Sequence, residues 1–355
     1  MLFICAAMLC AGNGARGQSA NANGGEWRFA ASGDSRNCGD VVMPGIAARA
    51  AKDGAAFYWH LGDFRAIYNF DEDIQHQPDV LAKPLNIIAY EEYAWKDFIS
   101  SQLLAFGKVP VYLAMGNHEA IPPMTREEYL IQFADWLDAP RLREQRLADD
   151  SHDFKLRTYY HWVQNGVDFI TLDNATTDQF DRAQTTWLEK VLKAAGANPD
   201  IHTVIVGMHK ALPDSLTDHS MDESPAGIES GRRVYADLLK LQNDAHKRVY
   251  VLASHSHYYI DGVFNTEYLR THGGVLPGWI VGTAGAQRYA LPKGAADARA
   301  AQTDVYGFLL GTVKSDGEVT FSFEQLSPSD VPGNVTEKYT PAFVQWCFDQ
   351  NSAAH

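Results

Sequence analysis

Cysteine is scarce in this chain of 355 residues, which has only 4 of them. A metal site made of several thiolates is therefore excluded. Cys5 and Cys10 lie in the first short segment, so only Cys38 and Cys347 remain if that segment is removed. This pair forms either a disulfide outside the cytosol or two unrelated buried thiols, because the sequence does not place the two residues within bonding distance.

Positive charge is also in deficit, with 30 Lys and Arg against 44 Asp and Glu and a net charge of -14. Phosphate-rich surfaces repel such a protein, so we expect no binding to nucleic acid or to anionic membranes. A phosphorylated ligand must instead be attracted by a local group of positive charges. Nothing in the sequence indicates an obligate protein partner.

A long hydrophobic run is missing too. The first residues, MLFICAAMLCAG, form an apolar run that is too short to span a bilayer. Small and polar residues follow it, which is typical of a secretory signal peptide, although no Lys or Arg precedes the apolar core. We therefore expect residues 1–20 to be a signal peptide and leader, residues 26–330 to form the domain, and residues 331–355 to be a C-terminal extension. The expected location is periplasmic or secreted.

Two common motifs of other enzyme classes are absent in their proper context. GNGARG, at residues 12–17, has the glycine spacing of a dinucleotide site but has no strand before it and no helix after it. The G-x-S-x-G turn of serine hydrolases does not occur. Neither dinucleotide-dependent chemistry nor serine-based hydrolysis is indicated.

What the chain does contain is an alternation of apolar runs with amphipathic stretches, which is typical of a layered α/β protein. Strands are expected at residues 27–32, 55–61, 109–115, 202–208, 248–254 and 278–284. Hairpin turns are expected at Asn165-Gly166 and Asp316-Gly317, and helices at residues 41–52, 91–106, 126–137 and 185–195. Because many strands follow one another late in the chain, a second sheet is expected. The predicted fold is α/β with two facing mixed β-sheets flanked by helices.

Five of the expected strands end in side chains that bind metal ions. These side chains are Asp34, Asp63, Asn117 with His118, His209, and His255 with His257. Because the carboxyl ends of neighbouring strands open into one crevice, residues far apart in the sequence can meet there. His255 and His257 lie on alternate residues after a buried strand, so they should point the same way.

The mixture of donors indicates which metals would bind. Carboxylate, amide oxygen and imidazole together suit Mn, Fe, Zn or Co better than calcium, which prefers oxygen alone. Two divalent or trivalent ions about 3.5–4 Å apart can share one carboxylate and hold a phosphoryl oxygen and a hydroxide together. Such a pair would explain how an acidic protein attracts an anion.

The order of the motifs, GD, GD, GNHE, His and then His-x-His, resembles the calcineurin-like metallophosphoesterase superfamily, over residues 27–325. The resemblance implies an αββα sandwich that holds two metal ions. The ligands it implies are Asp63 for both ions, Asp34 and His257 for one, and Asn117, His209 and His255 for the other. His118 would lie beside the substrate, where an imidazole can donate a proton or a hydrogen bond to the leaving oxygen, and Glu119 would orient it.

The sequence departs from the superfamily at Arg36, where the pattern Asp-x-His is usual. It also lacks the Tyr that purple acid phosphatases carry three residues after the bridging Asp, since Ala66 stands there, and Tyr68 is assigned a role outside the direct ligands. A guanidinium cannot bind a cation but can hold two phosphate oxygens, so Arg36 and Arg65 are candidate substrate-binding residues. A salt-bridge role for either Arg stays open.

These features predict a metal-dependent hydrolase of phosphate esters with a small phosphorylated substrate. A dinuclear centre would activate hydroxide for in-line attack on phosphorus, and a phosphomonoester is favoured. A phosphodiesterase or nucleotidase is the alternative, with specificity set by the connections at residues 64–90 and 210–230. The third hypothesis is a non-catalytic protein that binds a phosphate ligand, in which Arg36 has disabled one metal site.

Overall fold

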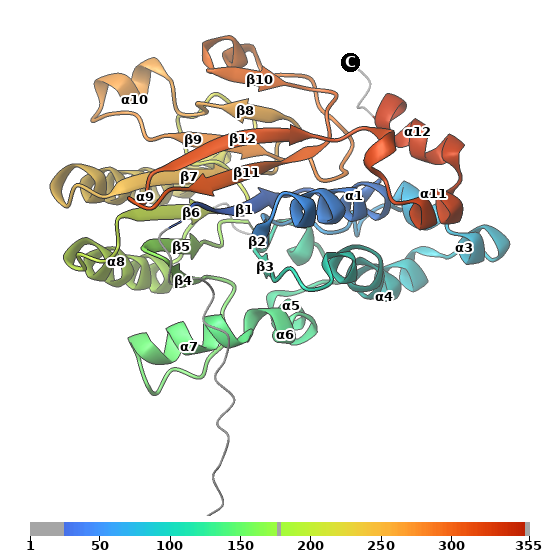
Figure 1. Ribbon diagram of the computed structural model, residues 1–355, viewed down its shortest axis with the longest axis horizontal. Helices are drawn as coiled ribbons and strands as arrows, with labels where there is room; N and C mark the ends of the chain where they lie inside the picture. Colours follow the sequence, from blue (N-terminus) through green and yellow to red (C-terminus); the bar gives the residue numbers. More distant parts are fainter. Residues whose placement is uncertain (1–24, 176–178, 352–355) are drawn as a thin grey trace, which may run out of the picture.

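Two facing β-sheets form the centre of the structure, a computed structural model that describes residues 25–175 and 179–351 (Figure 1). Within these residues the first sheet has five strands in the order β12-β11-β1-β2-β3, and the second has seven in the order β10-β8-β9-β7-β6-β5-β4. The strands of the first sheet are β1 (Trp27–Ser32), β2 (Ala55–His60), β3 (Val111–Leu113), β11 (Gly307–Val313) and β12 (Val319–Gln325). The strands of the second sheet are β4 (Tyr160–Gln164), β5 (Val167–Thr171), β6 (Thr203–Gly207), β7 (Arg248–Ala253), β8 (Tyr259–Asp261), β9 (Gly278–Val281) and β10 (Ala300–Gln302). The predicted α/β fold with two facing mixed sheets is confirmed.

The direction of the strands decides where side chains can converge. In the first sheet β1, β2 and β3 run parallel, and in the second β5, β6, β7 and β9 run parallel. The carboxyl ends of parallel neighbours lie at the same edge of their sheet, and that edge is where ligands bind in open α/β sheets. The predicted metal ligands all follow strands of these two parallel groups.

The expectation that late strands build a second sheet is wrong for the last two long strands. β11 and β12 instead extend the first sheet. β11 pairs antiparallel with β1, with Ala31 opposite Leu309, and β12 pairs antiparallel with β11. This pairing covers the edge of β1, whose backbone N–H and C=O groups would otherwise lack partners.

Aromatic side chains fill the space between the two sheets. The rings of Phe29 on β1 and Phe57 on β2 stack with centroids 5.4 Å apart. Both rings contact Phe169 of β5 edge to face, at 5.1 and 5.0 Å, and Trp162 of β4 stacks on Phe169 at 5.1 Å. Such pairs contribute about 0.5–1.5 kcal/mol each beyond the burial of their area. This aromatic packing therefore fixes the spacing of the two sheets and the positions of the strand ends from which the loops begin.

Helices cover the outer faces of both sheets (Figure 1). Helices α1 (Gly39–Lys52) and α4 (Ile87–Asp97) pack on the first sheet, and α8 (Arg182–Ala197) and α9 (Pro225–Asp244) pack on the second. The remaining α-helices are α2 (Glu72–Gln75), α3 (Pro78–Ala82), α5 (Arg126–Gln132), α6 (Ala134–Leu137), α7 (Pro140–Asp149), α10 (Glu267–Thr271), α11 (Gly333–Tyr339) and α12 (Pro341–Gln350). Within the described ranges no helix is both long and apolar enough to cross a membrane. The predicted signal peptide lies outside the described residues.

The helix expected over residues 91–106 is divided into three pieces. It begins earlier, as α4, and continues as a π-helical turn at Phe98–Gln102 and a 3₁₀ turn at Leu103–Phe106. The helix expected over residues 126–137 is likewise split into α5 and α6. The long connection at residues 64–90 contains the short helices α2 and α3 and the start of α4, so much of it has regular structure.

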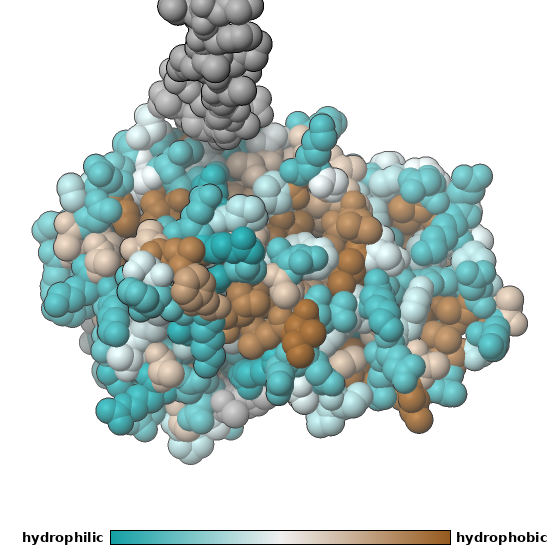
Figure 2. All heavy atoms as spheres, turned by 90° about the horizontal axis from the view of Figure 1, so that it is seen from below, coloured by the Kyte–Doolittle hydropathy of each residue, from teal (hydrophilic) through white to brown (hydrophobic). Residues whose placement is uncertain are grey.

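Apolar side chains also reach the surface on the side where α5, α6 and α7 lie, and they are interspersed with hydrophilic ones (Figure 2). A groove of about 540 Å³ between α4 and α5 is lined by Ile88, Trp95 and Ile131 together with Glu91 and Glu128. None of the predicted site residues lines this groove, so it is separate from the candidate site.

A disulfide joins Cys38 to Cys347, with their Cα atoms 5.9 Å apart. Of the two alternatives that the sequence left open, the bonded pair is therefore the one that the structure has. Cys38 immediately precedes α1 and Cys347 lies in α12, so the bond ties the C-terminal helices to the start of the domain. Arg288 strengthens this attachment, because its Nη1 donates to the carbonyl oxygen of Phe348 at 2.6 Å.

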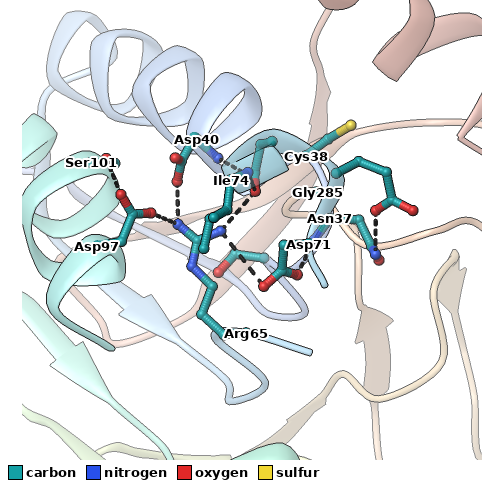
Figure 3. Close-up of polar contacts among 12 residues, drawn as sticks. Asn37, Cys38, Asp40, Arg65, Asp71, Ile74, Asp97, Ser101 and Gly285 are labelled. Atoms are coloured by element: carbon teal, nitrogen blue, oxygen red, sulfur yellow. Dashed lines mark hydrogen bonds and ion pairs between the residues drawn. The ribbon is translucent and has the colours of Figure 1, made fainter. Parts of the chain in front are cut away.

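Arg65 is completely buried in a cluster of carboxylates (Figure 3). Its guanidinium donates to Asp73 at 2.9 Å and, at shorter range, to Asp40 and Asp97, while Asp71 lies 4.0 Å away. A substrate-binding residue must reach the crevice, and Arg65 is 0% exposed. The prediction that Arg65 binds substrate is therefore wrong. Its role is structural, because its guanidinium binds carboxylates of α1 and α4 and so attaches the 64–90 connection to these helices.

Replacement of Arg65 by Met should destabilise the protein strongly, because the carboxylates of Asp40, Asp73 and Asp97 would stay buried without their cation. We expect the free energy of unfolding to fall by about 3–5 kcal/mol, measured by urea denaturation. Arg143→Met is the matched control, since Arg143 pairs with a carboxylate at the surface and should leave the urea midpoint nearly unchanged. Similar midpoints for the two variants would contradict a structural role for Arg65.

Candidate metal centre

The six predicted ligands meet at the carboxyl ends of strands from both sheets. They are Asp34 (after β1), Asp63 (after β2), Asn117 (after β3), His209 (after β6), and His255 and His257 (after β7). Side-chain atoms of Asp63 and His209 lie 3.2 Å apart, and those of Asp34 and His257 lie 3.3 Å apart. The structure thus brings together residues that are separated by more than 220 positions in the chain.

One half of the centre is built around the imidazole of His209. Its Nδ1 lies 2.9 Å from the carbonyl oxygen of Leu61, which can only accept, so Nδ1 carries a proton and Nε2 is the nitrogen available to a metal ion. That Nε2 lies 3.0 Å from Asn117 Oδ1, 3.2 Å from Asp63 Oδ1 and 3.0 Å from His255 Nδ1. One carboxylate oxygen, one amide oxygen and two imidazole nitrogens thus converge at hydrogen-bonding range. These four side chains therefore fit a metal ion.

The electrostatics of His209 agree with that interpretation. Burial alone would lower the pKa of His209, but the carboxylate of Asp63 outweighs burial and raises the pKa to about 9. The same carboxyl has a pKa well below its usual range, because the attraction of nearby imidazoles exceeds the cost of burial. Both shifts mean that this pocket favours positive charge.

The other half of the centre contains Asp34, Asp63 and His257. Among the described residues, Asp34 Oδ1 and Asp63 Oδ2 are buried carboxylate oxygens without a hydrogen-bond partner. An unsatisfied buried carboxylate oxygen is costly, so these two atoms also indicate that a cation belongs here. His257 Nδ1 donates to the carbonyl oxygen of Gln287 at 2.6 Å, which turns its Nε2 lone pair inward.

Arg36 extends its guanidinium into this second half. Its Nη2 donates to His257 Nε2 at 3.0 Å, its Nη1 donates to His118 Nε2 at 2.7 Å, and its Nε lies 3.9 Å from Asp63 Oδ2. Only 7% of Arg36 is exposed. Of the two predicted arginines, Arg36 lies in the candidate site and Arg65 does not.

His118 lies beside the cluster, as the sequence predicts, but both of its ring nitrogens are engaged. Nδ1 donates to the carbonyl oxygen of Ala66 at 2.6 Å, and Nε2 accepts from Arg36. Burial, followed by the charge of Arg36, lowers the pKa of His118 to about 4, although Asp63 opposes the shift. In this arrangement His118 is a neutral acceptor, so it can donate to a leaving oxygen only after Nε2 gains a proton.

Glu119 has a different role from the one expected. It was expected to orient His118, but its carboxylate accepts from the backbone N–H groups of Asp63, Phe64 and Gly116 at 2.9, 2.8 and 2.7 Å. Glu119 therefore fixes the two loops after β2 and β3. The carbonyl of Ala66 is what orients His118.

Backbone conformation marks the same residues. Asp34, Asp63 and His255 have positive φ angles of 62°, 59° and 66°, in the left-handed region that non-glycine residues rarely adopt. Such residues cost about 1–3 kcal/mol each and persist where the surrounding structure fixes them, commonly at functional sites. Gly116 allows the loop of Asp63 to pack closely against it, because a Cβ at residue 116 would overlap both Oδ1 and the backbone nitrogen of Asp63.

Some residues around the site were missed or only partly anticipated in the sequence. The ring of Tyr289 stacks on His257 at 4.0 Å, and no motif marks this residue. Tyr68, which the sequence places near the site, is 62% exposed, and its ring lies 5.1 Å from that of His118. Ser254 donates to the carbonyl of Leu61 at 2.8 Å and so supports the loop that orients His209. The two tyrosines make aromatic walls beside the imidazoles.

Comparisons with known proteins agree with this geometry. Residues 43–259 match the family described as calcineurin-like phosphoesterase, which is well over half of the chain. The chain therefore belongs to the calcineurin-like phosphoesterase family, as its motifs predicted, and is a metallophosphoesterase by membership. The matched segment begins after Asp34 and Arg36, so it does not cover the motif in which this chain departs from the usual pattern. No curated protein sequence matches the chain.

Among solved structures, the chain is similar to a purple acid phosphatase, PPD1, from yellow lupin (Lupinus luteus) seeds, with a TM-score of 0.54 and 16% identity. The similarity covers 85% of this chain and 52% of the lupin protein, so the chain spans about half the length of that relative. It also matches GAP50, the anchor in the inner membrane complex of Plasmodium, with a TM-score of 0.47, 13% identity, and coverage of 93% and 97% of the two chains. At this identity the lupin structure supports the fold alone.

Gly116→Ala should weaken metal binding, and its circular dichroism spectrum checks that the variant is folded. The added Cβ must displace Asp63, the residue shared by both halves of the centre. Changes to groups that support metal ligands typically lower affinity about 10–100-fold, and we expect a decrease of that size for Mn²⁺ in calorimetric titration of the metal-free protein. Gly333→Ala is the control, because a Cβ at Gly333 meets no atom within 4 Å. Equal Mn²⁺ affinity of the two variants would argue against Asp63 as a ligand.

Proposed function

We propose that this protein hydrolyses phosphate esters in a metal-dependent reaction and that small phosphomonoesters are its favoured substrates. The observation that carries the proposal is the ring of inward-facing donors around His209 Nε2, with Asp63, Asn117 and His255 each within 3.2 Å. Membership of the calcineurin-like phosphoesterase family supports the same reaction class.

The proposed ligands are the six residues that converge, and the donors are those expected for Mn, Fe, Zn or Co. A metal ion bound there would polarise the phosphoryl group and make hydroxide available at neutral pH for in-line attack. The carbonyl oxygens of Leu61 and Gln287 hold the tautomers of His209 and His257 that metal binding requires. The resemblance to the superfamily implies two ions.

Arg36 supports a preference for monoesters. Its guanidinium keeps a positive charge at any physiological pH and has further N–H groups besides the two that donate to His118 and His257. A monoester carries more negative charge on its terminal oxygens than a diester does, and a guanidinium can hold two of those oxygens. We propose that Arg36 binds the phosphoryl group while His118 lies next to the leaving oxygen.

The purified protein should cleave p-nitrophenyl phosphate faster than bis-p-nitrophenyl phosphate, and EDTA should abolish turnover until metal is restored. Faster cleavage of the diester, or of 5′-nucleotides alone, would favour the phosphodiesterase or nucleotidase alternative. Absence of metal-stimulated turnover of any phosphoester would favour the non-catalytic binding protein.

His118→Ala provides the residue-level arm of this experiment. We expect kcat to fall at least about 10²-fold, the lower range for loss of a proton-transferring or charge-stabilising side chain, with an unchanged circular dichroism spectrum. His152→Ala is the matched control, since His152 is an exposed histidine of the loop after α7. Turnover of His118→Ala equal to that of the control would remove His118 from the mechanism.

We propose further that the protein is exported to the periplasm or secreted. The Cys38–Cys347 disulfide supports this location, because disulfides persist in oxidising compartments and are rare in the cytosol. Expressed in a bacterium with an export pathway, the protein recovered outside the cytosol should lack a leader within residues 1–20 and should show no free thiol in its intact mass after alkylation. A full-length chain with two alkylated cysteines beyond the leader would count against export.

A further inference from the structure

The lone pair of His257 Nε2 can serve only one partner. Its Nδ1 is committed to the carbonyl oxygen of Gln287 at 2.6 Å, so Nε2 is the atom that a metal ion would need. That atom accepts from Arg36 Nη2 at 3.0 Å. A metal–nitrogen bond is about 2.0–2.1 Å long and uses the same electron pair. An ion in this half of the centre and the observed position of Arg36 therefore exclude each other.

The guanidinium of Arg36 already supplies a positive charge beside the carboxylates of this half of the centre. The guanidinium lies 3.9 Å from Asp63 Oδ2, and the carboxylate of Asp34 also attracts it. Arg36 is 7% exposed, so water screens these attractions little. A second metal ion would bring two more positive charges beside a guanidinium that cannot lose its proton.

The backbone around Arg36 holds the guanidinium in this position. The N–H of Ser35 donates to the carbonyl of Asp63 at 2.9 Å, and the N–H of Asn37 donates to Asp71 Oδ1 at 2.7 Å. Two residues after Arg36, Cys38 donates to the carbonyl of Gly285 at 3.0 Å and forms the disulfide to α12. These bonds fix the backbone on both sides of Arg36, and the contacts with His118 and His257 hold its guanidinium in the half-site.

We propose that Arg36 is the resident cation of the half-site formed by Asp34, Asp63 and His257, so that the chain binds one metal ion instead of two. The ion belongs to the half built from Asp63, Asn117, His209 and His255. This inference rests on the proposed metal centre and changes its composition. It differs from the hypothesis of a disabled site, because the guanidinium replaces the charge of an ion and still presents N–H groups to a phosphoryl oxygen.

The test counts metal ions and does not depend on turnover. Metal-free protein is loaded with Mn²⁺, passed through a desalting column, and analysed by atomic emission and by electron paramagnetic resonance. We expect one Mn²⁺ per chain and the six-line spectrum of an isolated ion. Arg36→His, which restores the Asp-x-His pattern, should bind two Mn²⁺ per chain and show the broadened spectrum of a coupled pair. Arg143→His, with its new histidine at the surface, should stay at one ion.

Two ions per wild-type chain with a coupled spectrum would overturn the proposal, and so would one ion in a folded Arg36→His variant. No bound ion in the wild-type protein would overturn it as well. If Arg36→His does not fold, the wild-type count and spectrum decide the question by themselves. This inference and the proposed function can fail separately. If the protein binds two ions and cleaves phosphomonoesters, the inference is wrong and the proposed function stands. If it binds one ion and shows no turnover, the inference stands and the proposed function is wrong.

Discussion

Three imidazoles around the candidate centre each bond to a backbone carbonyl through Nδ1, and this contact decides which nitrogen faces the crevice. The three pairs are His209 with Leu61, His118 with Ala66, and His257 with Gln287, at 2.9, 2.6 and 2.6 Å. Because a carbonyl can only accept, the proton lies on Nδ1 in every pair and Nε2 faces the crevice. The convergence of three Nε2 atoms on the crevice follows from this constraint, and these nitrogens are the ones a metal ion or a guanidinium can contact.

The scaffold serves to keep those carbonyls and strand ends in place. Parallel strands of both sheets bring the ligands to one edge, and the aromatic layer around Phe57 and Phe169 fixes the distance between the sheets. Arg65 binds the carboxylates of Asp40, Asp73 and Asp97 and so attaches the 64–90 connection to α1. The disulfide joins the residues after Arg36 to α12. A buried charge cluster and a disulfide, each two residues along the chain from a residue of the centre, thus restrict where the side chains of the centre can lie.

Arg36 gives this member of the family an unusual distribution of charge. A histidine at that position would add one more neutral donor and leave the carboxylates to be neutralised by an ion. The guanidinium of Arg36 places its positive charge 3.9 Å from Asp63 Oδ2 and at the same time donates to the acceptors of His118 and His257. This placement of charge is the basis for the proposal that the chain binds one metal ion. The same contact makes His118 an acceptor, so its Nε2 has no proton to donate in this arrangement.

Much of the fold and the candidate ligands could be predicted from the sequence, because both are local patterns. Apolar runs that end in Gly and Asp marked β1 and β2, and Asn165-Gly166, with φ angles of 48° and 79°, marked the hairpin between β4 and β5. Asp34 and Asp63 each follow a buried strand, so their meeting was expected from strand direction alone. The division of the helix at residues 91–106 depends on packing against α1 and was not visible in its periodicity.

The sequence by itself determined which segments form the main strands, the donor types and the family, since these follow from residue order, whereas several strands are shorter than expected, such as β3 at Val111–Leu113. Only the tertiary structure decided which arginine enters the site, which group Glu119 binds, and that Cys38 meets Cys347. Arg36 and Arg65 each lie two residues after an Asp of a GD motif and look alike in sequence. One guanidinium meets imidazoles and the other meets buried carboxylates, because the partners of a long charged side chain come from distant segments that no local pattern specifies.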